Sequence, residues 1–308
     1  MTLRDTLEGF LAEYPREERL AFDPVEIPHR YQDPRDVEVS ALVCASLAYG
    51  RVDLFKPKLE ELHQGMGASP AAFVRRLRVP EAARWLRPFV YRFNVGTDVA
   101  ALLLGIGAAL RERGSLEALF VEALEAAGGS LEKALGAFTR AIRAGAPLPE
   151  LRRALGKERG LHHLLPAVGG GAAKRLNLYL RWMVRGPDAV DFGIWKRVPA
   201  ARLVIPLDTH IHRMARHLGL TGRKTAGWRT AEEITQALRK LDPADPVKYD
   251  FALCHFGMSG ACPLQPSRPV CQQCALLSAC RTGRRLTAGR AARERRALPP
   301  SLRGSLIR

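Results

Sequence analysis

Four of the six cysteines lie close together near the C-terminus, and their spacing restricts what this part of the chain can fold into. They follow the pattern Cys262-x8-Cys271-x2-Cys274-x5-Cys280. The short x2 step turns two sulfurs toward one point, and the longer intervals close around the other side. The pattern predicts a metal-binding loop, either an iron–sulfur cluster or a zinc site with four cysteine ligands. The other two, Cys44 and Cys254, are expected to pack in the core.

The N-terminal segment and the apolar runs carry no export or membrane signal. The segment MTLRDTLEGFLAEY mixes acidic residues into an amphipathic pattern, unlike a secretory or transit peptide. The longest apolar run, residues 99–110, lies between Asp98 and Arg111 and is too short to cross a bilayer, so a buried helix is expected there. We therefore expect a cytoplasmic protein without a membrane partner, whose thiols stay reduced. We also expect a monomer.

The chain is strongly basic. Its 48 Lys and Arg residues outnumber its 31 Asp and Glu residues, which gives a formal net charge of +17. Because such a charge attracts polyanions, a polyanionic partner is the first hypothesis to test. The basic character continues into residues 281–308, where Glu294 is the single acid. We expect this tail to be poorly ordered and to add salt-sensitive affinity for nucleic acid.

Helix-start signals recur along the chain, whereas the alternating pattern of strands is scarce. Asp33 and Ser69 each precede a proline, which pairs an N-cap residue with proline at the first helical position. Further helical runs follow Ser115, Ser130 and Thr230. Glu233, three residues after Thr230, predicts a capping box. We expect an all-α protein of roughly ten to twelve helices.

Two segments interrupt the helical pattern. In the first, the apolar run LHHLLPAV leads into Gly169, Gly170 and Gly171 and then into a helix predicted over residues 172–185. Glycines let a backbone approach a phosphate closely, and the amides at the following helix N-terminus can bind it. The alternative is an ordinary flexible turn. The second segment, residues 186–206, predicts a long connection or a short extra helix.

Asp208 opens the helix that is predicted to end at Gly219. By itself, an aspartate at this position is most often an N-cap or a first-turn acid that the helix dipole stabilises. A carboxylate kept ionised by a helix N-terminus can also stabilise developing positive charge or activate a nucleophile. On these residues alone, the capping role is the expectation for Asp208.

Three segments resemble motifs of the helix-hairpin-helix DNA glycosylase superfamily. LDTHIHRMARHLGL resembles its VDTHV-x-R-x-x-x-R-L-G signature, and LPAVG resembles its L-P-G-V-G hairpin. HFGMSGAC…PVCQQCALLSAC looks like the [4Fe–4S] loop of the endonuclease III and MutY branch, with a longer first interval. The long interval before Asp208 is similar to that of archaeal 8-oxoguanine glycosylases, and AAKRLNLYLRWMVRGPDAVDFGIWKRVP looks like a related, less characterised bacterial family.

The resemblance implies roles for individual residues. Asp208 would be catalytic, and Lys174 would attack the sugar and form a Schiff base. The superfamily places that lysine two residues after the second hairpin glycine. In this chain Gly171 occupies that position, so Lys174 lies three residues further along. The implied DNA contacts are Gly169, Gly170, Gly171, Arg175, Arg181 and His210. Tyr49 and Arg51 would face the damaged base, and Cys262, Cys271, Cys274 and Cys280 would bind the [4Fe–4S] cluster, with zinc as the alternative.

The implied function is base-excision repair of DNA. The enzyme would be a glycosylase that removes a damaged, oxidised base such as 8-oxoguanine, with AP-lyase activity through Lys174. One alternative is a monofunctional glycosylase in which Asp208 activates water. Another is a DNA-binding protein that kept the fold and lost catalysis, an interpretation that the displaced lysine favours.

The resemblance also implies a two-domain all-α glycosylase fold with a C-terminal cluster loop. Residues 1–35 would form an N-terminal helical segment that packs with the C-terminal half. Residues 36–200 would form the helical domain with the hairpin, and residues 201–261 the helical domain with Asp208. Residues 262–280 would be the cluster loop, followed by the basic tail at 281–308.

Overall fold

The computed structural model describes residues 2–166, 168–169 and 171–288. Within these ranges the protein is all-α, as the sequence predicts. Its strands form one small antiparallel hairpin, in which β1 (Val90–Tyr91) pairs with β2 (Asn94–Val95). None of the helices that the structure describes has the length and apolar character needed to span a membrane.

The helices follow one another through short connections. The N-terminal elements are α1 (Leu3–Glu13), α2 (Arg16–Leu20) and the 3-10 turns η1 (Pro24–Glu26) and η2 (Pro28–Arg30). The middle of the chain holds α3 (Pro34–Leu47), α4 (Val52–Met66), α5 (Pro70–Arg76), α6 (Val79–Leu86), α7 (Gly96–Arg113), α8 (Leu116–Ala126), α9 (Leu131–Ala144), α10 (Leu148–Leu155), α11 (Leu161–Leu164) and α12 (Lys174–Val184). After the turn η3 (Ala200–Arg202) come α13 (Thr209–Leu218), α14 (Trp228–Arg239), α15 (Asp250–Met258), α16 (Arg268–Gln272) and α17 (Arg281–Thr287).

Most helix starts form where the sequence predicts them. The side chains of Asp33, Ser69, Ser115 and Ser130 each accept a hydrogen bond from a backbone amide in the first turn of the next helix. The capping box at Thr230 is wrong, because α14 already begins at Trp228 and Glu233 binds Thr221 and Arg223 instead. The predicted number of helices is too low, since one-turn helices such as α11 are too short to show a helical period.

The core centres on α7, the helix predicted from the apolar run 99–110. Its residues from Gly96 to Leu110 are all buried. Two glycines make this possible: a Cβ at Gly105 would collide with the carbonyl oxygen of Ile142 in α9, and one at Gly107 with that of Val74 in α5. The glycines therefore let α7 pack directly on the backbones of two neighbouring helices.

A buried carboxylate ties two distant segments to α3. Glu38 is fully buried, and its Oε1 accepts a hydrogen bond of 2.7 Å from the indole Nε1 of Trp195. Its two carboxylate oxygens also accept from the backbone amides of Leu116 and Glu117 at the start of α8. Because the amides at a helix N-terminus carry partial positive charge, this carboxylate caps α8 from another helix.

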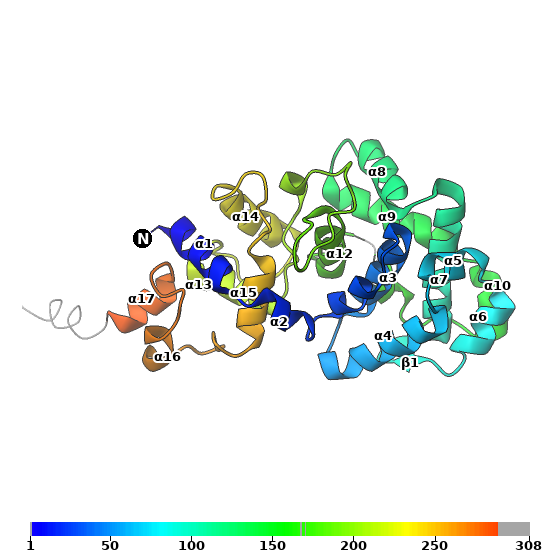
Figure 1. Cartoon of the computed structure of the whole chain (residues 1–308), viewed down its shortest axis with the longest axis horizontal. Helices are drawn as coiled ribbons and strands as arrows, with labels where there is room; N and C mark the ends of the chain where they lie inside the picture. The colour runs from blue at the N-terminus through cyan, green and yellow to red at the C-terminus, as the bar shows by residue number, and fades with distance from the viewer. Residues whose placement is uncertain (1, 167, 170, 289–308) are drawn as a thin grey trace, which may run out of the picture.

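The N-terminal segment lies against the C-terminal part of the chain. Figure 1 shows α1 at the same end of the molecule as α13, α16 and α17, whereas α5, α6 and α10 lie at the other end. The hydroxyls of Thr6 and Ser278 are 2.9 Å apart, and Tyr249 donates a hydrogen bond of 2.6 Å to Glu8. The connection over residues 186–206 is irregular apart from η3, in agreement with the long connection that the sequence predicts.

Replacing Glu38 should destabilise the fold strongly. Glu38→Ala leaves Trp195 Nε1 and two backbone amides buried without partners, so we expect the free energy of unfolding to fall by about 3 kcal/mol. Urea denaturation followed by circular dichroism measures this. Glu61→Ala, at an exposed ion pair with Lys58, should change it by less than about 0.5 kcal/mol. Equal effects of the two substitutions would contradict the role given to Glu38.

Candidate functional site

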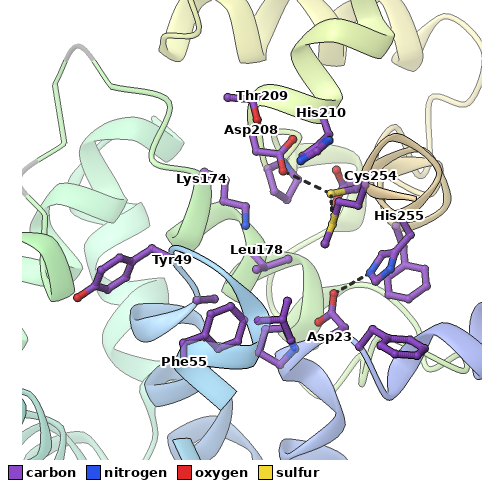
Figure 2. Close-up of a pocket in the computed structure, with 18 of the residues that line it drawn as sticks. Asp23, Tyr49, Phe55, Lys174, Leu178, Asp208, Thr209, His210, Cys254 and His255 are labelled. Carbon is purple, nitrogen blue, oxygen red and sulfur yellow. Dashed lines mark hydrogen bonds and ion pairs between the residues drawn. The ribbon is translucent and has the colours of Figure 1, made fainter. Parts of the chain in front are cut away.

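A pocket of about 290 Å³ lies where five segments of the chain meet. Its walls come from the start of η1 and the residues before it, the connection between α3 and α4 with the first turn of α4, one face of α12, the start of α13, and α15. Figure 2 shows Asp208, Lys174, Cys254 and His255 around this space. Since these segments are far apart in the sequence, the pocket exists only in the folded chain.

Asp208 is the N-cap of α13 and lines the pocket. Its Oδ1 accepts a hydrogen bond of 2.8 Å from the amide of Ile211, and the side chain is half-buried. Its Oδ2 lies 3.5 Å from the thiol of Cys254, which donates to it. The capping role and the pocket position therefore occur together, because one oxygen satisfies the helix and the other faces the cavity.

Lys174 is the first residue of α12 and lines the same pocket. Its side chain extends into the cavity toward Asp208 (Figure 2). The predicted helix start at residue 172 is two residues too early, because Ala173 adopts a left-handed conformation with φ of 46°. The N-terminal ends of two helices thus direct a cation and an anion into one space.

A buried ion network lies behind this pair. Arg181 is only 3% exposed, and its guanidinium binds Asp191 at 3.1 Å and Asp250. Burial raises the pKa of Asp250 to about 6, and Arg181 and the more distant Lys174 oppose that rise. We expected Arg181 on an exposed DNA-facing side of its helix. That placement is wrong, because the guanidinium neutralises buried carboxylates.

A second buried pair was not predicted. His255 Nε2 lies 3.0 Å from Asp23 Oδ2, and both residues line the pocket. Burial alone would raise the pKa of Asp23, but the hydrogen bond and charge of His255 outweigh it and lower that pKa. No signal in the sequence identifies this pair, because the two residues are 232 positions apart. His255 begins the segment HFGMSGAC, but nothing in that segment points to Asp23.

The two cysteines outside the C-terminal cluster behave differently. Cys44 is fully buried in α3, as expected for a core residue. Cys254 is half-buried and packs against the core, as expected, but it also lines the pocket and contacts Asp208, which the sequence did not predict. Burial raises the pKa of the Cys254 thiol well above its ordinary value, and the charge of Asp208 raises it further. The thiol therefore remains protonated and can donate a hydrogen bond to the carboxylate.

The residues predicted to face a base are only partly at the pocket. Tyr49 lines it, but Figure 2 shows the ring directed away from Asp208, and the hydroxyl binds Asn94. Arg51 is exposed, pairs with Asp53 and is not part of the pocket wall. His210 is part of the wall, next to Asp208.

The two described glycines of the predicted hairpin, Gly169 and Gly171, are exposed. Gly169 and Gly171 face open space, whereas Gly170 lies outside the described residues. Arg175, the next predicted DNA contact, is half-buried and donates hydrogen bonds to the carbonyl oxygens of Ser46 and His163. Its guanidinium therefore holds α11 and the end of α3 together.

The four clustered cysteines line one small, mostly apolar cavity between α13, α16 and α17. Cys280 Sγ accepts a hydrogen bond of 3.1 Å from the amide of Gly283, and Cys262 Sγ lies 3.3 Å from His217 Nδ1. Among the residues that the structure describes, no three His, Cys, Asp or Glu side chains are already placed as ligands of one metal ion. The donor type and the shared cavity fit a thiolate-bound metal centre.

The chain belongs to the DUF2400 family, described as proteins of unknown function, whose model matches residues 23–259. Comparisons with curated proteins and with solved structures gave no match. The match contains every pocket residue except Phe22 and ends before the cysteine loop.

The family match overturns the resemblance to the helix-hairpin-helix DNA glycosylase superfamily and its endonuclease III, MutY and archaeal branches. The reason lies in what the short motif encodes. Asp208 caps α13, and Gly219 ends it in a left-handed conformation with φ of 79°. An N-cap aspartate and a C-terminal glycine are the ordinary start and stop residues of a helix, so unrelated helical proteins share them.

Asp23 should make folding stability depend on acid pH. The pKa of Asp23 in the folded chain lies below its ordinary value of 3.8. The ionised carboxylate therefore adds to the free energy of unfolding above pH 3.8, and this stabilisation is lost as the pH falls through the folded pKa. We expect the melting temperature of Asp23→Asn to fall less steeply than that of the wild type between about pH 5 and about pH 3. Identical slopes would show that the Asp23–His255 pair does not stabilise the fold.

Proposed function

We propose that the protein is a DNA glycosylase with AP-lyase activity, which removes an oxidised base such as 8-oxoguanine. The observation that carries the proposal is the position of Lys174 and Asp208 at two helix N-termini that open into one pocket. The formal charge of +17 supports a nucleic acid as the partner. The pocket volume lies near the lower end of the range for small-molecule sites, which suits a single extruded nucleotide.

The proposed reaction uses both side chains. Lys174 first gives up a proton to solvent, and its neutral amine then attacks C1′ of the extruded nucleotide. The N-glycosidic bond breaks, and its electron pair leaves with the base, which takes up a proton. Asp208 stabilises the positive charge on the sugar and accepts the proton that the attacking nitrogen releases. Opening of the sugar ring gives a Schiff base. Loss of a C2′ proton then expels the 3′ phosphate by β-elimination, and water releases Lys174.

We further propose that two helical domains, residues 36–200 and 201–261 with the N-terminal segment 1–35, close on DNA around the pocket. The cysteine loop would support the second of these. Cys280 Sγ contacts the carbonyl oxygen of His217, and a Cβ at Gly219 would collide with the side chain of Arg281. Cys262, Cys271, Cys274 and Cys280 would bind a [4Fe–4S] cluster, which contributes structural support to the end of α13 opposite Asp208.

Borohydride trapping tests the chemistry. With a duplex that contains 8-oxoguanine, the wild type should release the base and form a covalent protein–DNA adduct on reduction. Lys174→Ala should lose the adduct, because the amine that forms the Schiff base is gone. Asp208→Asn should slow base release by about 100-fold. Lys224→Ala, which removes an exposed lysine outside the pocket, should behave as the wild type does.

The other outcomes separate the alternatives. Base release without an adduct would favour a monofunctional glycosylase in which Asp208 activates water. Binding of damaged duplexes without release from any of a panel of lesions would favour a DNA-binding protein without catalysis. Failure to bind DNA at all would refute the proposal.

Metal analysis of protein purified without oxygen tests the cysteine loop. We expect about four iron and four sulfide per chain, and about one zinc if the alternative holds. Cys274→Ser should reduce the metal content by at least half because it removes one thiolate ligand. Cys44→Ala, which changes a buried cysteine outside the loop, should leave it unchanged. Metal-free protein with a normal melting temperature would contradict a metal centre.

A further inference from the structure

An exposed aromatic ring stands at the tip of the hairpin beside the pocket. In the hairpin, Tyr91 pairs with Asn94, so Arg92 and Phe93 form a two-residue turn. Arg92 has a backbone φ of 52°, which residues other than glycine rarely adopt. Phe93 is 52% exposed, although burial of its ring would be favourable. The hairpin therefore holds a large apolar side chain in solvent at the cost of backbone strain.

The ring of Phe93 begins a short stack of flat side chains. Its centroid lies 4.9 Å from that of His163, with 28° between the two planes. His163 in turn lies 4.1 Å from the exposed ring of His162. Burial, His162 and Arg175 lower the pKa of His163, so its ring is neutral at neutral pH. The group thus presents flat ring faces and edges beside the exposed ring of Phe93.

The hairpin is fixed to the pocket rim through Tyr49. The hydroxyl of Tyr49 donates to the side-chain oxygen of Asn94, and the hydroxyl of Tyr91 donates to the carbonyl oxygen of Tyr49. The guanidinium of Arg175 lies 4.9 Å from the centroid of the Tyr49 ring. A Cβ at Gly50 would lie 2.9 Å from Arg92 Nη1, so glycine lets the rim approach the hairpin turn. Tyr49 and Gly50 also line the pocket, which places the aromatic stack at its edge.

We infer that Phe93, His162 and His163 form a stacking surface for an unpaired nucleobase next to the nucleotide held in the pocket. The inference rests on the proposed function, because extrusion of one nucleotide leaves its former partner base without a pair. A nucleobase is flat on both faces and stacks on aromatic side chains whatever its sequence. The charged residues in contact with the stack, Arg92 and Arg175, are both cations, which suits a phosphate backbone.

Substitutions in the hairpin test the inference on the full-length protein. The probe is a duplex that carries a tetrahydrofuran analogue of an abasic site, compared with the same duplex without it. Phe93→Ala should weaken binding to the abasic duplex by about 5- to 150-fold, the range for loss of one base–aromatic stack. The loss should be equal at about 50 mM and about 200 mM salt, because stacking releases no counterions.

Two variants serve as controls. Val90→Ala, which changes another exposed apolar residue of the same hairpin, should bind as the wild type does. Phe93→Tyr should bind as the wild type does, because the tyrosine ring can stack in the place of the phenylalanine ring. Loss of affinity in Val90→Ala equal to that in Phe93→Ala would show that the hairpin fold, and not the ring, matters.

Photocrosslinking gives a direct reading. With 5-iodouracil opposite the abasic analogue, irradiation should join the base to Phe93 or His163, as located by mass spectrometry. Crosslinks confined to other residues, or unchanged affinity of Phe93→Ala, would overturn the inference. Base release by the wild type would still support the proposed function. The hairpin would then be a surface for a protein partner. If the wild type binds neither duplex, the proposed function fails and the inference fails with it.

Discussion

The buried guanidinium of Arg181 holds together the segments that build the pocket. It joins α12 to the connection before η3 through Asp191 and to α15 through Asp250. A buried charge without partners would cost several kcal/mol, so these three side chains require one another. Because Lys174 is two helical turns earlier on α12, the same network fixes the direction from which its amine enters the pocket.

Two helix N-termini define the chemistry of that space. Asp208 satisfies the first turn of α13 with one oxygen and faces the cavity with the other, where the protonated thiol of Cys254 holds it. At the other end of α13, Cys280 of the cysteine loop contacts the carbonyl oxygen of His217. One helix therefore links the candidate metal loop to the candidate catalytic carboxylate.

The family match shows what a short motif can indicate about local structure and what it cannot indicate about family. The aspartate motif correctly located a helix cap and a pocket residue, and it assigned the wrong superfamily. Cap residues, a glycine stop and an apolar stripe are dictated by helix physics, so they recur in unrelated chains. A catalytic proposal for this chain therefore rests on the pocket formed by Lys174 and Asp208.

The sequence by itself determined the helical class, the caps at Asp33 and Ser69 and the buried run within α7, because these depend on neighbours within one or two turns. Tertiary structure alone decided the burial of Arg181 and the contact between Asp23 and His255. The helical period places a side chain on a face of its own helix. Which neighbour covers that face depends on how distant segments pack, and no local pattern encodes it.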